Sequence, residues 1–120
     1  MIHSKKILLA DTSATILEVL TFAFETIGNK IQIAESKDKL IEHINKNRYD
    51  LIIIDIDLFK EETIEQIKAY TKKHQTQIFI LSENSDTQTK ITAKENGITG
   101  WIVKPFIPEK LAKTIISYLN

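Results

Sequence analysis

Five short apolar segments recur along the chain, and their spacing predicts five β-strands. The third segment is apolar up to its final aspartate, which is typical of a central strand covered on both faces. The second alternates apolar and polar residues, as an edge strand does. The predicted strands are KILLA (6–10), KIQIA (30–34), LIIID (51–55), QIFILS (77–82) and GWIVK (100–104).

Each predicted strand is followed by a segment with helical spacing of apolar residues. Residues 14–27 form one apolar stripe that stops at Gly28, a residue common at helix ends. Ser36 is expected to cap the second helix, and a third is expected over 61–72. The motif SDTQ (85–88) predicts a capping box for a fourth helix that ends at Gly97. That helix has few apolar residues and is expected to pack lightly. Pro108 is expected to begin the fifth helix. The apolar stripes are Ile16, Leu17, Leu20, Phe24 and Ile27, then Leu40, Ile41 and Ile44, then Ile64, Ile67 and Tyr70, then Ile91 and Ala93, and finally Leu111, Ile115 and Leu119.

This alternation of strand and helix, repeated five times, predicts an α/β fold of one domain over residues 1–120. Right-handed crossovers between parallel strands place helices on both faces of the sheet, which gives three layers. In such folds the chemistry lies beyond the carboxyl ends of the strands.

The composition excludes several classes of protein. The chain of 120 residues carries 16 basic and 16 acidic residues, so its formal net charge is zero and we expect no nucleic acid or membrane as partner. It has no cysteine, which excludes disulfides and thiol catalysis. No apolar run approaches the roughly 20 residues of a membrane helix. We therefore expect a cytoplasmic protein.

Polar and charged residues stand at the carboxyl ends of the predicted strands. Asp11 follows the first strand, and Asp55 ends the third, with Asp57 two residues beyond. Ser82 ends the fourth strand and Lys104 the fifth. Each one alone has a simpler explanation, because an aspartate at a strand end commonly begins a turn or caps a helix. Together they predict a functional edge of the sheet.

This set of residue types suits the transfer of a phosphoryl group onto a carboxylate. Mg²⁺ prefers hard oxygen ligands, which aspartates supply. Phosphoryl transfer depends chiefly on positioning and on neutralising charge. A lysine ammonium can neutralise a phosphoryl oxygen, and a serine hydroxyl can donate a hydrogen bond to it.

Four motifs at these positions resemble the receiver domains of two-component response regulators. They are ILLADTSATI (7–16), YDLIIID (49–55), FILS (79–82) and GWIVKPF (100–106), the last being most similar to single-domain, chemotaxis-type regulators. The resemblance extends over essentially the whole chain. It implies a flavodoxin-like fold with the strand order 2-1-3-4-5.

The resemblance also implies a role for each site residue. Asp55 would accept a phosphoryl group from a histidine kinase or a phosphotransfer protein. The metal site for Mg²⁺ would comprise Asp11, Asp55 and the backbone carbonyl of Asp57. Ser82 and Lys104 would bind the phosphoryl group after transfer.

A conformational switch is implied as well. Ser82 would move toward the phosphoryl group, and Trp101, at the aromatic switch position, would fill the space that it leaves. The change would reach a downstream protein target through a surface formed by helix 4, strand 5 and helix 5. Exposed residues of that surface are expected to include Thr89, Lys94, Ile107 and Lys110. The peptide bond between Lys104 and Pro105 would be cis.

Four positions depart from the family pattern. Thr12 stands where the family usually has a second acid, and its presence is expected to weaken Mg²⁺ binding. Asp57 is an additional acid, which is either a solvated loop carboxylate or a neighbour of the incoming phosphoryl group. Glu83 replaces a small residue and would either repel phosphate or act as a metal ligand. Phe59 replaces a proline, which matters least.

These departures leave three alternatives open. Thr12 and Glu83 would also suit a pseudo-receiver that binds partners without phosphorylation. The motif DIDLF (55–59) resembles that of haloacid-dehalogenase-like phosphatases, although theirs follows the first strand. A flavin carrier is the third alternative, because the turn DTSATI (11–16) is loosely similar to a flavodoxin phosphate loop, although it lacks the glycine of that loop. Apart from the phosphatase alternative, the sequence predicts a phosphoacceptor and not a conventional enzyme.

Overall fold

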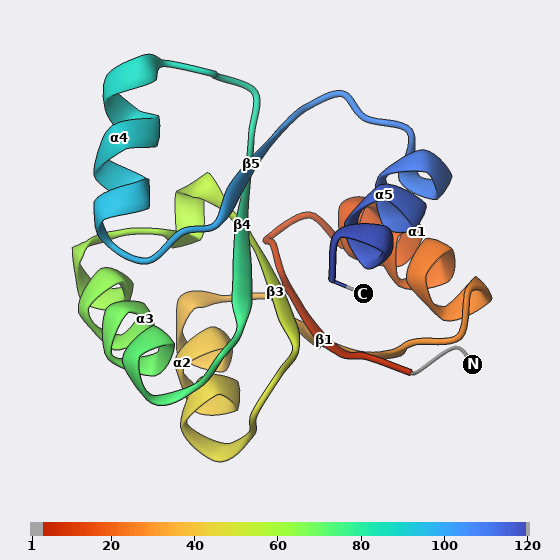
Figure 1. The fold of residues 1–120 in the computed structure, drawn as a ribbon, viewed down its shortest axis with the longest axis horizontal. Coiled ribbons are helices and arrows are strands. Elements are labelled where there is room, and N and C mark those ends of the chain that lie inside the picture. Colours follow the sequence, from red (N-terminus) through yellow and green to blue (C-terminus); the bar gives the residue numbers. More distant parts are fainter. Residues whose placement is uncertain (1–3, 120) are drawn as a thin grey trace.

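The computed structural model describes residues 4–119, which form a five-stranded sheet between two layers of helices (Figure 1). The strand order is β2-β1-β3-β4-β5 and every neighbouring pair is parallel, so the predicted three-layer α/β fold and its strand order are confirmed. The strands are β1 (Lys6–Ala10), β2 (Lys30–Ala34), β3 (Leu51–Asp55), β4 (Gln77–Ser82) and β5 (Gly100–Val103).

The helices cover both faces of the sheet. α1 and α5 lie on one face, and α2, α3 and α4 lie on the other (Figure 1). A short 3-10 helix between β3 and α3 was not expected from the sequence. The helices are α1 (Ala14–Thr26), α2 (Lys37–Lys46), the 3-10 helix η1 (Ile56–Leu58), α3 (Glu61–Lys73), α4 (Thr87–Glu95) and α5 (Pro108–Leu119). None of the helices within residues 4–119 is long and apolar enough to cross a membrane.

The hydrophobic core has two parts, one on each side of the sheet. Alternate residues of the fully buried β3 contribute to each part: Leu51 and Ile53 join the core under α1 and α5, while Ile52 and Ile54 join the other. This division follows from the two-residue period of a strand, which turns successive side chains to opposite faces. The continuous apolar run at 51–54 is therefore the signature of a strand buried on both sides.

The helix ends follow the predicted signals except at α4. Ser36 caps α2, and Gly28 follows α1 with a positive φ of 95°. The prediction of a capping box at 85–88 is wrong by one residue: Asp86 is the N-cap, and its carboxylate accepts hydrogen bonds from both the backbone N–H and the hydroxyl of Thr89. An ionised carboxylate is a stronger acceptor than the Ser85 hydroxyl, which explains the shift. The light packing of α4 is confirmed, because Ala93 is its one buried residue.

Strand register brings the predicted site residues to one edge of the sheet. Ala10 pairs with Ile54, so the residues that follow them stand on adjacent strands at the same height. Ser82 pairs with Val103, the residue before the lysine. The residues placed at this edge are Asp11, Asp55, Ser82 and Lys104.

Candidate functional site

At the carboxyl edge of the sheet, Lys104 lies between two buried carboxylates. Its Nζ is 2.6 Å from Asp55 Oδ1 and 3.6 Å from Asp11 Oδ2. Asp55 is 4% exposed and Asp11 is 3% exposed. Buried carboxylates are costly unless they are paired, and the ammonium of Lys104 supplies the pairing charge.

The backbone orients both carboxylates in the same way. Asp11 Oδ1 accepts a hydrogen bond from the N–H of Ser13 at 2.8 Å, and Asp55 Oδ2 accepts one from the N–H of Asp57 at 3.0 Å. Each is a local turn in which an aspartate side chain bonds the backbone two residues on. The turn of Asp11 leads into α1, where Ser13 is the N-cap. The turn of Asp55 leads into η1, for which Asp55 is itself the cap.

The surroundings shift the pKa of Asp11 and that of Lys104. Burial is the largest effect on Asp11 and raises the pKa of its carboxyl, and the negative charge of Asp55 raises it further. Burial lowers the pKa of Lys104, but its hydrogen bond to Asp55 and the charges of both carboxylates outweigh that effect and raise it. The lysine is thus held in its charged form.

The donor set fits a magnesium ion. Asp11 Oδ2 is buried and has no hydrogen-bond partner, so a buried anionic oxygen is available beside a second carboxylate. Mg²⁺ commonly binds through one or two carboxylates and keeps several waters. Within residues 4–119 no cluster of three or more His, Cys, Asp or Glu side chains could hold a metal. The remaining protein ligand would be a backbone oxygen, and the carbonyl of Asp57 stays the prediction.

Ser82 lies at the end of β4 and is bonded to its own loop. Its Oγ accepts a hydrogen bond from the N–H of Asn84 at 3.0 Å. The carbonyl of Asn84 accepts a second bond, from the indole N–H of Trp101 at 2.9 Å. The sequence analysis missed Asn84. Its place in the polar run ENSD after a strand end, a composition typical of turns, was the available signal.

The positions that depart from the family pattern fall into two groups. Thr12, Asp57 and Glu83 are exposed to solvent, and Glu83 lines a groove with Lys104. Phe59 is buried in the core that α2 and α3 cover, where its ring packs with apolar neighbours. The Lys104–Pro105 bond is cis, as expected, and Thr89, Lys94, Ile107 and Lys110 are exposed, as expected.

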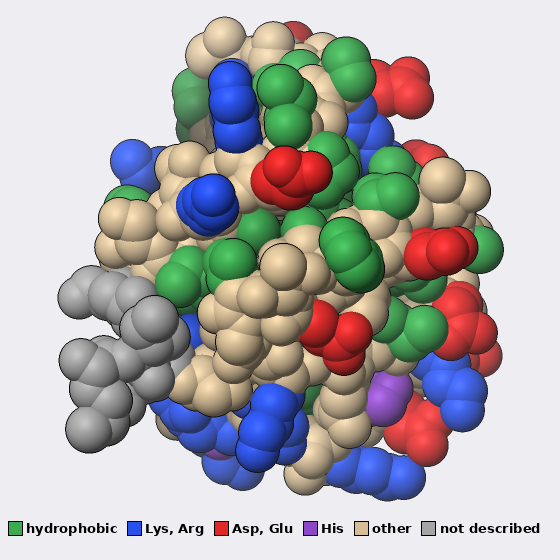
Figure 2. Space-filling view, turned by 90° about the vertical axis from the view of Figure 1, so that its right-hand side faces the viewer, with side chains coloured by type: hydrophobic (Ala, Val, Ile, Leu, Met, Phe, Trp, Pro, Cys, Tyr) green, Lys and Arg blue, Asp and Glu red, His purple; other side chains and the backbone are tan. Residues whose placement is uncertain are grey.

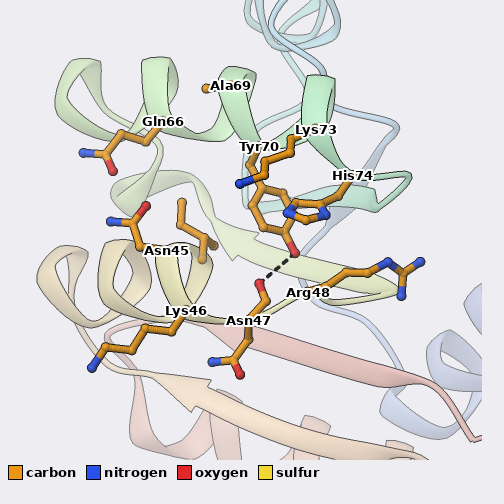
Figure 3. Close-up of a pocket in the computed structure, with 10 residues that line it drawn as sticks. Asn45, Lys46, Asn47, Arg48, Gln66, Ala69, Tyr70, Lys73 and His74 are labelled. Atoms are coloured by element: carbon orange, nitrogen blue, oxygen red, sulfur yellow. Dashed lines mark hydrogen bonds between the residues drawn. The ribbon is translucent and has the colours of Figure 1, made fainter.

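A second hollow lies at the opposite end of the sheet, between the ends of α2 and α3 (Figure 3). Its volume is about 390 Å³, and Lys46, Arg48, Lys73 and His74 are among its lining residues. Lys46 and Arg48 extend away to different sides in Figure 3, and their charges are paired with Glu42 and Asp50. Two helix C-termini, which carry partial negative charge, also end here. This hollow shares no lining residue with the site at the carboxyl edge.

Comparison with known proteins identifies the family. The family model described as the response regulator receiver domain matches residues 7–116. The chain belongs to this family. Among curated relatives, the receiver domain is 29% identical over 118 residues to the transcriptional regulatory protein ResD of Bacillus subtilis (strain 168), covering 98% of this chain and 49% of the relative. The chain spans about half the length of the curated relatives it matches.

Solved structures agree with the family. The chemotaxis protein CheY4 of Vibrio cholerae is 30% identical, with a TM-score of 0.81 and coverage of 94% of this chain and 97% of that chain. A CheY-like receiver domain from Methanospirillum hungatei JF-1 has a TM-score of 0.84 at 22% identity, covering 98% of this chain and 94% of that chain. Response regulators act in phosphorelay signal transduction, and this membership decides against the phosphatase and flavin-carrier alternatives.

Proposed function

We propose that this receiver domain, taken to extend over residues 1–120, accepts a phosphoryl group on Asp55. The observation that carries the proposal is the contact of 2.6 Å between Asp55 Oδ1 and Lys104 Nζ, at a buried edge that also holds Asp11. An aspartate with a purely structural role needs only the hydrogen bonds to the backbone of its own turn. This one ends a fully buried strand and meets both a cation and a second acid.

The chemistry follows from the residues at this edge. An oxygen of Asp55 attacks the phosphorus of a phosphohistidine, so that an O–P bond forms while the N–P bond breaks. The electron pair stays on the imidazole nitrogen, which then takes a proton from water. Lys104 holds its positive charge where the phosphoryl oxygens arrive, and a fixed charge of this kind stabilises the transition state. The domain is itself modified and is not a conventional enzyme.

Asp11 and Asp55, together with the Asp57 carbonyl, would hold Mg²⁺. When bound, the ion supplies positive charge that offsets the charge of the phosphoryl oxygens. The exposed Thr12 brings no second acid to Asp11, so we expect weaker binding of the ion than in receivers that have both acids.

Ser82 would couple phosphorylation to the surface of the domain. Its Oγ accepts the N–H of Asn84, which leaves the hydroxyl hydrogen free for a phosphoryl oxygen once the side chain rotates. Rotation breaks the bond to Asn84 and so changes the loop that holds Trp101. The lightly packed α4, with β5 and α5, would then present an altered surface to a protein target.

The partners that follow are a histidine kinase or phosphotransfer protein upstream and a protein target downstream. A cytoplasmic location is part of the proposal. From the similarity to chemotaxis-type regulators we predict a signalling role of that type.

Intact-mass spectrometry after incubation with acetyl phosphate and Mg²⁺ tests the proposal. We expect a mass gain of one phosphoryl group in the wild type and none in Asp55→Asn. Glu65→Gln is the matched control, because it removes an exposed acid on α3, outside the site, and should leave the mass gain intact. An unmodified wild type across a range of Mg²⁺ concentrations would contradict the proposal and favour a pseudo-receiver that binds partners without phosphorylation.

A further inference from the structure

A groove between α1 and the edge strand β2 is lined by apolar side chains. It has a volume of about 890 Å³ and begins beside Thr12. Phe22 is 71% exposed and Ile33 is 41% exposed, although both are large hydrophobic residues. Figure 2 looks onto the side that carries α1 and α5, where exposed hydrophobic side chains lie among acidic and basic ones. Exposed apolar surface with a polar rim is typical of an interaction site.

One wall of the groove is the open edge of the sheet. In the described chain β2 pairs with β1 alone, along its whole length. The N–H of Lys30 and the carbonyl of Ala34 form hydrogen bonds on the β1 side. Because backbone groups alternate sides along a strand, those of Ile31 and Ile33 point to the open edge. An edge of this kind is a template for a further strand. Both isoleucine side chains also line the groove.

The rim of the groove is uniformly acidic. Glu18, Glu25 and Glu35 are among the ten lining residues, and no lysine, arginine or histidine is. None of the three glutamates forms an ion pair with another residue of the stretch 4–119. The chain as a whole has a formal net charge of zero, so this negative charge is local to the groove. A basic partner would be complementary to it.

We propose that this groove binds an extended partner segment whose apolar centre is flanked by lysine or arginine. The segment adds to the open edge of β2 through backbone hydrogen bonds at Ile31 and Ile33. Its alternate apolar side chains enter the groove beside Phe22, and its basic ends meet the glutamates. Binding does not require phosphorylation of Asp55, so it can be measured on the unmodified chain. A failure to bind would leave the proposed phosphorylation of Asp55 untouched.

The probe is a blocked peptide, Lys-Lys-Val-Thr-Val-Thr-Val-Lys-Lys, titrated into the ¹⁵N-labelled chain. We expect amide shifts at Ile31, Ile33 and Glu35 that weaken at high salt, because screening reduces attraction between exposed charges. Two control peptides separate the contributions. One has glutamate in place of lysine, and the other has proline in place of threonine, which removes backbone donors.

Variants of the chain assign the binding to the groove. We expect the affinity for the peptide to fall at least tenfold in two variants. One combines Glu18→Gln, Glu25→Gln and Glu35→Gln, and the other carries Ile33→Lys alone. Ile91→Lys on α4 is the matched control, since Ile91 is 45% exposed and lies outside the groove. It should leave the affinity unchanged.

Several results would overturn the proposal. One is the absence of amide shifts throughout the titration, and another is shifts centred on another face. A third is binding of the acidic or the proline peptide as tight as that of the basic one, and a fourth is a loss of affinity in Ile91→Lys as large as that in the groove variants. Sedimentation of the chain alone gives a further test, because a dimer disrupted by Ile33→Lys would show that a second copy occupies the groove.

Discussion

The indole N–H of Trp101 donates to the backbone carbonyl of Asn84, the same residue whose N–H is bonded to Ser82 Oγ. The two bonds connect the end of β4 to β5 through a single residue. A further bond, from the N–H of Asp86 to Asn84 Oδ1, extends the connection to the N-cap of α4. A movement of Ser82 is therefore expected to reach both the aromatic ring and the helix.

Tryptophan fluorescence should report this movement, because Trp101 is the one tryptophan of the chain. We expect the emission to shift to shorter wavelength when acetyl phosphate and Mg²⁺ are added, since the half-buried ring becomes more buried. Ser82→Ala should still gain the phosphoryl group by mass while losing most of the shift. A phosphorylated wild type with unchanged emission would show that the ring stays in place.

Magnesium should stabilise the fold through Asp11. At ten times its dissociation constant, a ligand that binds only the folded state adds about 1.4 kcal/mol to the free energy of unfolding. We expect Mg²⁺ to raise the wild-type melting temperature and to have little effect on Asp11→Asn, which lacks the buried anionic Oδ2. Melting curves with and without Mg²⁺ measure this.

Two further variants sharpen that measurement. Glu65→Gln removes an exposed acid on α3, outside the site, and should respond to Mg²⁺ like the wild type. Thr12→Asp supplies the second acid, so we expect it to bind Mg²⁺ about tenfold more tightly than the wild type does. This corresponds to about 1.4 kcal/mol of binding free energy. An unchanged response in Asp11→Asn would place the ion elsewhere.

The element order could be predicted because it depends on local periodicity. The apolar run at 51–54 and the stripe over 14–27 each reveal which faces are buried. The meeting of Asp11, Asp55 and Lys104 follows from topology, since parallel strands end at one edge.

Contacts between side chains and distant backbone could not be predicted in the same way. The bond from Trp101 to Asn84 depends on the path of the loop after β4, and loop paths are set by tertiary packing and not by periodicity. The groove beside β2 likewise depends on how far α1 extends over the sheet, which the pattern of KIQIA does not reveal.

The Tyr70 hydroxyl is another tertiary contact, and its removal should destabilise the fold. It accepts a hydrogen bond from the N–H of Tyr49 at 2.8 Å. It also donates one to the carbonyl of Asn47 at 3.3 Å (Figure 3). Tyr70→Phe leaves a buried backbone N–H without a partner, which costs about 1–3 kcal/mol. Urea unfolding measures the loss. Tyr118→Phe is the control, because Tyr118 is 66% exposed and should change stability little.

Asp50 should make stability depend on pH. Partial burial alone would raise the pKa of Asp50, but the N–H of Lys6 at 2.9 Å and the guanidinium of Arg48 at 3.1 Å together lower it. A carboxyl whose pKa is lower in the folded state stabilises the fold above its unfolded pKa of about 4 and loses that contribution as pH falls through the folded value. The stabilisation is thus present at neutral pH and absent in strong acid.

Comparison of the wild type with Asp50→Asn isolates this contribution from those of other carboxyls. We expect the wild type to be more stable by about 1 kcal/mol near neutral pH, with the difference shrinking toward zero as the pH falls through the lowered pKa of the folded state. Urea unfolding of both proteins across this range gives the difference directly. A gap that stayed constant with pH would assign the stabilisation to the shape of the side chain and not to its charge.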